Sequence, residues 1–277
     1  MPDIDIPARP TPASPARILA RGVRGLMMPH RIAMALVALA GLVAMVLMMD
    51  WSWLPAYLPR LWAGLGMTLA MLGASVVFGF LIALPLGVAQ VIGPRPLRWL
   101  ALGFCTVIRG TPLLLQLWLI YFGLGSLFAQ FPELRETWLW PYLRQAWPYG
   151  LFALTISFAA YQGEVMRGAF AGVPYGELEA ARAFGMSRGK VFRRVWFPRA
   201  LYRALPTLSG EIILQLKSTP LLATITVTDL YAVITRVRQA TFLTYEPLLF
   251  LVAVYLCLSA VLIGVLRWME TRVPQHG

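Results

Sequence analysis

Long uncharged stretches alternate with short charged segments along the whole chain. Five stretches run without a charge, and they cover residues 32–49, 61–94, 110–132, 145–163 and 247–266. A sixth stretch, 205–228, is interrupted by Glu211 and Lys217. A helix crosses ~30 Å of hydrocarbon with roughly 20 residues, so this pattern predicts six membrane-spanning helices.

Composition supports the same class of protein. Of the 277 residues, 59% are hydrophobic and only 13% are charged. A soluble globule of this size could not cover so many apolar side chains. We therefore predict an all-α integral membrane protein. Cys105 and Cys257 lack CxxC spacing, so neither a disulfide framework nor a metal site is indicated.

The basic residues are distributed unequally between the connecting segments. Sixteen Lys and Arg lie in four of them: 1–31, 93–98, 172–205 and the tail after 266. Only five lie in the other three: 50–60, 131–149 and 229–246. Because Lys and Arg near span ends are retained in the cytoplasm, both termini and segment 172–205 are predicted to be cytoplasmic. This sidedness also accounts for the net charge of +12, so nucleic-acid binding is not indicated.

The start of the chain is predicted to add a lead and one extra helix. Residues 1–31 are rich in Pro, Ala and Arg, which indicates a disordered cytoplasmic segment. Residues 32–49 lack a small-residue cleavage site and therefore predict an uncleaved transmembrane helix.

Segment 172–205 contains a short amphipathic helix by its pattern. Pro174 and Gly176 end the preceding helix, and Glu177 and Glu179 suit a new first turn. Apolar and small positions then recur at helical spacing, at Leu178, Ala181, Phe184 and Gly185.

Two uses of this helix are compatible with its residues. Ala180, Ala181 and Gly185 would let a partner approach the backbone closely, and Phe184 would offer an apolar knob to a pocket. Alternatively, the helix rests on lipid headgroups with its Arg and Lys towards anionic lipid.

The wider motif resembles the EAA loop of ABC importer permeases. EAARAFG at 179–185 is followed by nine residues and then by VWFP ending at Pro198. Val195 and Phe197 stand where that family commonly has Ile and Leu. The similarity covers roughly 60–270 and includes RGTPLLLQLWLIYFG at 109–123, EVMRGAFAGVP at 164–174, PRALYRALPTLSGEIILQLKSTPL at 198–221 and VTDL at 227–230.

The finer resemblance is to one type of subunit. The segment 130–149 and TYEPLLF at 244–250 look most like the M-type subunits of histidine/arginine/ornithine and opine importers. The chain differs from their five-helix form by its lead and its extra helix, whose role is unknown.

This resemblance implies a type I importer transmembrane domain in the bacterial inner membrane, over 60–270. It implies that Glu179, Ala180, Ala181, Phe184 and Gly185 dock in a groove of a cytoplasmic ABC ATPase dimer. A second permease subunit and a periplasmic solute-binding protein would complete the importer, with a basic amino acid or an opine as substrate. ATP and Mg would bind to the partner ATPase, because this chain has no GxxxxGK[ST] loop and would be non-catalytic.

Ionisable residues inside spans cost roughly 2.5–3.5 kcal/mol each near the centre, so they normally face a partner or a cavity. Arg109 precedes Gly110, Thr111 and Pro112, which free helix carbonyls, and its guanidinium is expected to satisfy those carbonyls or to face the pathway.

Glu164 and Glu211 are the acidic candidates. Glu164 lies one turn before Arg167, which favours an ion pair, but with Tyr161 and Gln162 it could also accept a substrate cation. Glu211 and Lys217 are too far apart along a helix to neutralise each other directly. The polar residues near them suit a hydrated stretch. The candidate pathway residues are Arg109, Gln116, Gln162, Glu164, Glu211, Lys217, Ser218 and Thr219.

A secondary transporter driven by an ion gradient is the main alternative. It would be expected to show internal inverted repeats, and the sequence shows none. A membrane enzyme would need a nucleophile–base pair or a metal cluster, yet His30 and His276 both lie near the chain ends. The EAA pattern favours the importer permease.

Overall fold

The computed structural model describes residues 37, 40, 41, 43 and 46–271. The chain divides into two compact units, Met1–Ser52 and Trp53–Gly277. In the first unit residues 37, 40, 41, 43 and 46–48 are helical, which agrees with part of the predicted helix 32–49. The predicted disordered lead 1–31 lies outside the described residues.

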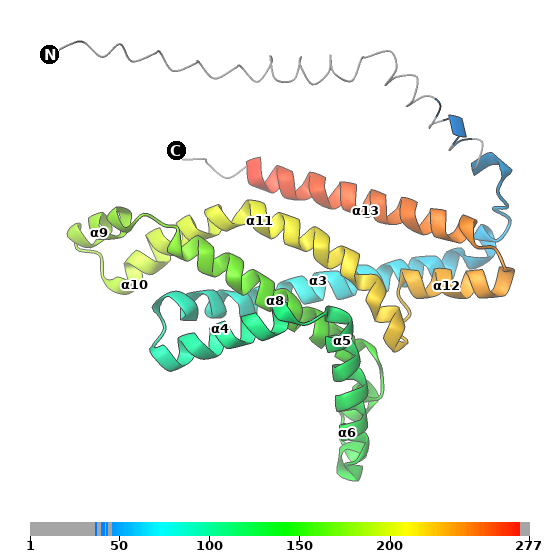
Figure 1. Cartoon of the computed structure of the whole chain (residues 1–277), viewed down its shortest axis with the longest axis horizontal. Helices are drawn as coiled ribbons and strands as arrows, with labels where there is room; N and C mark the ends of the chain where they lie inside the picture. Colours follow the sequence, from blue (N-terminus) through cyan, green and yellow to red (C-terminus); the bar gives the residue numbers. More distant parts are fainter. Residues whose placement is uncertain (1–36, 38–39, 42, 44–45, 272–277) are drawn as a thin grey trace. The chain divides into compact units, whose positions relative to one another are not determined.

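Every regular element in the described part of the second unit is a helix, as predicted (Figure 1). The long helices are α3 (Leu54–Ile92), α4 (Arg95–Gly110), α8 (Trp147–Ala171), α11 (Phe197–Ser218), α12 (Leu230–Thr241) and α13 (Tyr245–Thr271). The short helices are α5 (Leu113–Trp118), α6 (Gly125–Ala129), α7 (Trp140–Leu143), α9 (Tyr175–Ala183) and α10 (Arg188–Val191). The π-helical segments are η1 (Leu119–Leu124) and η3 (Phe192–Trp196), and the 3₁₀ segments are η2 (Pro132–Glu136) and η4 (Thr219–Ile225).

Helix α3 packs closely along α8, and glycine makes this approach possible. A Cβ added to Gly79 would lie 2.7 Å from Phe158 Cδ1, and one added to Gly87 would lie 2.6 Å from Met166 Cβ. Between apolar helices, such close van der Waals packing through small residues replaces the hydrophobic driving force that operates in water.

A buried amide ties α11 to this pair. Gln215 Nε2 donates to Ser75 Oγ of α3 at 3.0 Å and to the carbonyl of Leu154 in α8 at 3.1 Å. The Ser75 hydroxyl in turn donates to the Leu72 carbonyl. Three helices are thereby held in one register by groups that would be costly to bury unpaired.

The N-terminus of α12 is fixed against the first part of α3. Asp229 caps α12, its Oδ1 accepting from Ala232 N at 2.8 Å. Thr68 Oγ1 accepts from Leu230 N at 3.1 Å, and a Cβ on Gly64 would lie 2.9 Å from Val233 Cγ2.

Two of the described helices, α3 and α13, are long and apolar enough to cross a membrane. Two bent pairs bring the number to as many as four: α4 with Leu113–Ala129, bent by 104°, and Arg188–Ile225 with α12, bent by 53°. The predicted stretches 61–94 and 247–266 correspond to α3 and α13. Stretch 145–163 lies in α8, whose continuation carries Glu164 and Arg167. The count of six spans stays a prediction.

Helix α4 had no counterpart in the sequence prediction. Because Arg95, Arg98 and Arg109 interrupt the apolar pattern, the sequence predicted a connection between two spans here. The structure shows one amphipathic helix of 16 residues instead. Arg98 folds back so that its Nε donates to the Gln90 carbonyl at 3.0 Å and its Nη2 to the Val91 carbonyl at 3.0 Å. These bonds join α3 to α4 across the turn at Gly93–Pro94.

Candidate functional site

Helix α9 is the predicted amphipathic helix, and the structure divides it into an inner and an outer face. Leu178 and Ala181 are 5% and 6% exposed and belong to an apolar cluster with Val191 and Ala200. Ala181, expected among the contact residues, is therefore covered by its own chain and is unavailable to a partner. Glu179 and Ala180 are exposed, and Phe184 is 87% exposed.

The helix ends in a Schellman turn built on Gly185. Gly185 has φ +77°, its N–H donates to the Arg182 carbonyl at 2.9 Å, and Met186 N donates to the Ala181 carbonyl at 3.2 Å. Glycine adopts this left-handed conformation at little cost, since it has no Cβ. The glycine of the EAA motif thus ends α9 immediately after Phe184, which leaves that side chain projecting outward.

The inner face of α9 packs against η3 and shares an apolar cluster with two long helices. Glu177 Oε2 lies 2.9 Å from Arg199 Nε of α11. Trp196 Nε1 donates to the Phe170 carbonyl of α8 at 2.9 Å, and the same apolar cluster extends to Val88 of α3. Helix α9 thus shares one apolar cluster with residues of α8 and α11.

A second group of polar residues lies deeper in the fold, where α4 meets α8. The predicted Glu164–Arg167 ion pair is confirmed, with Glu164 Oε2 3.0 Å from Arg167 Nη2. Arg109 Nη1 lies 3.6 Å from the same oxygen, and its guanidinium lies 5.4 Å from the centroid of the Tyr161 ring. Glu164 thus links the end of α4 to α8.

The helix break at Gly110–Pro112 is satisfied by Gln116. Its Nε2 donates to the Ile108 carbonyl at 2.7 Å and to the Thr111 carbonyl at 2.9 Å. The interpretation that Arg109 satisfies these carbonyls is wrong, because an amide one turn after the proline reaches them directly. Gln116 is a positioning residue for the bend.

A cavity of about 190 Å³ lies beside the ion cluster, between the α4–α5 break, α8 and α11. Its lining residues are Thr111, Leu113, Ser157, Phe158, Tyr161, Glu211, Leu214, Gln215 and Ser218. Glu211 is the acidic group in this lining, and four hydroxyl-bearing side chains accompany it. We refer to this space as the Glu211 cavity.

The structure brings Glu211 and Ser218 to this cavity but not three other predicted residues. Lys217 is exposed on another face of α11, and the structure shows no ion pair between it and Glu211 among the described residues. Thr219 is buried, and its hydroxyl lies 3.0 Å from the Tyr255 hydroxyl. Gln162 is fully buried inside the helix packing.

Three polar residues of the cavity were not predicted from the sequence: Thr111, Ser157 and Gln215. Thr111 follows the recognised Gly110 break, and this position was the available signal. Ser157 and Gln215 carry no signal of their own, because their role depends on which helices meet.

An all-helical fold in which two helices are long and apolar enough to cross a membrane defines a helical membrane protein. Residues 75–275 match the family described as binding-protein-dependent transport system inner membrane component. The chain belongs to this family, whose members are permeases of ABC importers.

Three named relatives are permease proteins of amino acid or opine transport systems. The octopine permease protein OccM of Rhizobium radiobacter is 37% identical over 212 residues, which cover 74% of this chain and 84% of OccM. The nopaline permease protein NocM of Agrobacterium fabrum is 36% identical, covering 79% and 89%. The histidine/lysine/arginine/ornithine permease protein HisM of Salmonella typhimurium is 38% identical, covering 77% and 89%.

Solved structures agree on the fold. An amino acid ABC transporter crystallised with histidines has a TM-score of 0.70 at 31% identity, covering 81% of this chain and 99% of the other. The methionine ABC transporter MetNI, in an inward-facing conformation, has a TM-score of 0.59 at 20% identity, covering 79% and 98%. The type I importer permease fold is thereby confirmed, and the family assignment excludes the secondary transporter.

Proposed function

We propose that this chain couples ATP hydrolysis on a separate ABC ATPase dimer to the import of a basic amino acid or an opine. The chain pairs with a second permease subunit and receives its substrate from an extracytoplasmic solute-binding protein. It spans the membrane six times with both termini in the cytoplasm. The observation that carries this proposal is the outer face of α9, with Glu179, Ala180 and Phe184.

The position of Phe184 supports docking to a protein rather than rest on lipid. Its side chain projects at the end of α9, directly before a turn that fixes its direction. An exposed aromatic group on a rigid element is suited to fill a pocket of a partner, where buried aromatics dominate binding energy. Because α9 shares its apolar cluster with residues of α8 and α11, closure of the ATPase dimer would act on both helices.

The Glu211 cavity supports a cationic or zwitterionic substrate. A carboxylate among hydroxyl groups at a helix break offers acceptors to an ammonium or guanidinium group. The named relatives transport opines or histidine, lysine, arginine and ornithine. We propose that Glu211 contacts the cationic part of the substrate and that Arg109 and Glu164 hold the wall of this cavity.

The test uses the purified complex of this chain with its ATPase, second permease and binding protein in proteoliposomes. Phe184→Asp should lower stimulated ATP hydrolysis and uptake by more than about tenfold, since a hot-spot contact contributes ≥2 kcal/mol. Membrane insertion should be unchanged.

The matched control is Phe242→Ala. Phe242 is 91% exposed and lies between α12 and α13, far along the chain from α9. Its substitution should leave coupling intact. Normal uptake by the Phe184→Asp complex would refute docking through α9.

A further inference from the structure

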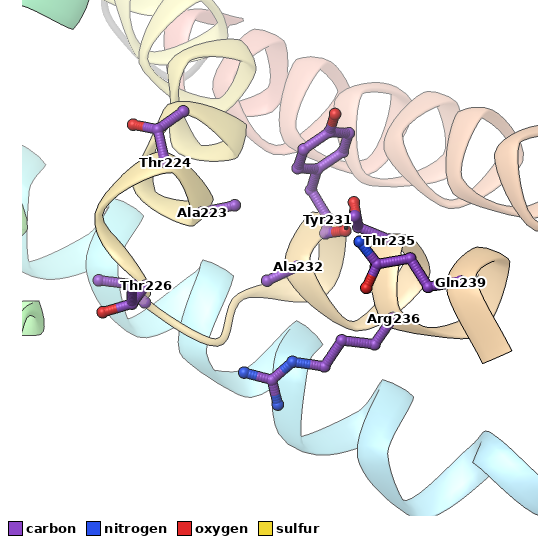
Figure 2. Close-up of a pocket in the computed structure, with 9 residues that line it drawn as sticks. Ala223, Thr224, Thr226, Tyr231, Ala232, Thr235, Arg236 and Gln239 are labelled. Carbon is purple, nitrogen blue, oxygen red and sulfur yellow. Dashed lines mark hydrogen bonds between the residues drawn. The ribbon is translucent and has the colours of Figure 1, made fainter.

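Residues of the segment 226–229, which joins η4 to α12, line two cavities. The first cavity has a volume of about 330 Å³, and its lining residues are Ala223, Thr224, Thr226, Val227, Tyr231, Ala232, Thr235, Arg236 and Gln239 (Figure 2). The second has a volume of about 340 Å³, and its lining residues are Met67, Tyr121, Arg144, Gln145, Ala146, Trp147, Thr226, Val227 and Thr228. Both cavities are large enough for a small molecule.

The charges of these two cavities are opposite to that of the Glu211 cavity. Each holds one arginine, Arg236 in the first and Arg144 in the second, and none of the lining residues that the structure describes is acidic. The Glu211 cavity holds a carboxylate, and its described lining has no basic residue. The first two therefore suit an anionic group, and the third suits a cationic one.

One hydrogen bond within the protein orients Arg236 and leaves other N–H donors of its guanidinium available. Its Nη2 donates to Thr228 Oγ1 at 3.2 Å, which orients the guanidinium towards the joining segment. Figure 2 shows this side chain reaching back from α12 towards that segment. A guanidinium has five N–H donors in a fork that matches a carboxylate, so donors remain for a ligand.

Hydroxyl and amide groups complete the first cavity. Thr224 Oγ1 accepts from Trp118 Nε1 at 3.1 Å and donates to the Leu221 carbonyl at 2.7 Å. Thr235 and Gln239 follow Tyr231 along α12, and Figure 2 shows them on the side of the cavity formed by that helix. Mixed hydroxyl, amide and guanidinium groups are typical of a site that orients a small polar molecule.

Thr226, which lines both cavities, has an unusual backbone conformation. Thr226 has φ +69°, a left-handed conformation that is rare for a β-branched residue. Val227 N donates to the Leu222 carbonyl at 3.3 Å, and buried Asp229 caps α12, so the segment is fixed on both sides of Thr226. Strained residues held by their surroundings cluster at ligand-binding and switch regions.

We propose that the cavity around Arg236 binds the carboxylate of the substrate before its cationic part reaches the Glu211 cavity. Arg236 pairs with the carboxylate, and Thr224, Thr226, Thr235 and Gln239 supply polar contacts around it. The proposal rests on the proposed function, since it names a first contact for the amino acid or opine on the side where the binding protein would release it.

The test measures direct ligand binding to the full chain in lipid nanodiscs, by saturation-transfer NMR with L-arginine and with agmatine. Agmatine has the same guanidinium group but no carboxylate. Wild-type protein should bind L-arginine more tightly than agmatine. Arg236→Gln should weaken L-arginine binding about tenfold, the loss expected for a hydrogen bond to a charged group, and should abolish the preference. Arg236→Lys should retain part of it.

The matched control is Arg60→Gln, an exposed arginine of α3 that lines neither cavity. It should bind both probes as the wild type does. Equal binding of L-arginine by Arg236→Gln and wild type would overturn the proposal, as would equal binding of the two probes by wild type.

A contact between Arg236 and an acidic surface of the solute-binding protein is the competing explanation. In that case Arg236→Gln would raise the binding-protein concentration needed for ATPase stimulation while leaving L-arginine binding by the isolated chain intact, and this result would overturn the proposal. Failure of α9 docking is distinguishable, because Phe184→Asp would then keep normal coupling, and this variant should leave the binding of both probes unchanged in either case.

Discussion

Individual glycines are required for different structural reasons in this chain, and Gly185 is required for its backbone conformation. Because its φ is +77°, Gly185→Ala should cost about 1 kcal/mol and loosen the end of α9. Uptake by the assembled transporter should fall while expression is maintained. The matched control is Gly176→Ala in the first turn of the same helix, where an added Cβ meets nothing within 4 Å. If both variants transported equally, the turn would not set the position of Phe184.

Gly87 is required because it lets α3 and α8 approach each other closely. An added Cβ would lie 2.6 Å from Met166 Cβ, and the larger Gly87→Leu would force α3 away from α8. We expect a loss of folded protein and a lower melting temperature in detergent, by several degrees or more. Gly73→Leu, in the same helix with open space around its position, should be tolerated. An unchanged melting temperature for Gly87→Leu would contradict the packing described here.

Residue patterns predicted some of these tasks and missed others. The Glu164–Arg167 pair was predictable because its members are three positions apart on one helix. The Gln215–Ser75 bond joins residues 140 positions apart, and no local pattern indicates which helices will meet. Arg109 was assigned to the freed carbonyls because it adjoins them, but Gln116 approaches them from the far side of the bend.

At the scale of elements, the link between α4 and α8 depends on a charge shared by two arginines. Reversing the charge with Arg109→Glu should lower uptake and thermal stability, because Glu164 would then face a second carboxylate. In a double-mutant cycle with Arg109→Gln and Glu164→Gln, the double variant should lose less than the sum of the two single variants, with a coupling energy of roughly 0.5–1 kcal/mol for such a half-exposed pair. Additive losses in the double variant would show that Arg109 and Glu164 act independently.

The sequence predicted helices correctly where apolar stretches are long. The prediction failed where a helix contains several charged residues. Helix α3 and helix α13 were predictable from hydropathy alone. Helix α4 was not, since its arginines lie on one side of an amphipathic helix that the spacing of charges had marked as a connection. The continuation of helix through η3 and η4 likewise depends on packing against neighbours.

For the whole molecule, the uneven distribution of Lys and Arg predicts which ends face the cytoplasm. Glycine contacts place α12 beside the first part of α3, and Figure 1 shows α9 at the opposite end of the long helices. With Cys105 and Cys257 replaced by Ser, Phe242→Cys should react with an impermeant maleimide added outside spheroplasts. Phe184→Cys should react only after the membrane is opened.

The reverse labelling pattern would show that the proposed orientation in the membrane is wrong. Reaction of both cysteines from outside would contradict the proposed number of spans between them. Gly176→Cys, in α9, serves as a second reporter for the inner side. Its reactivity should follow that of Phe184→Cys.

The division of α9 into two faces has a consequence for how such transporters diversify. Leu178 and Ala181 hold the helix in place and point inward, whereas the exposed residues include Glu179, Ala180 and Phe184. Exchange of these three side chains would redirect the permease to a different motor subunit without disturbing its own interior. The residues proposed to select the partner and the residues that stabilise the fold thus lie on separate faces of α9 and its C-terminal turn.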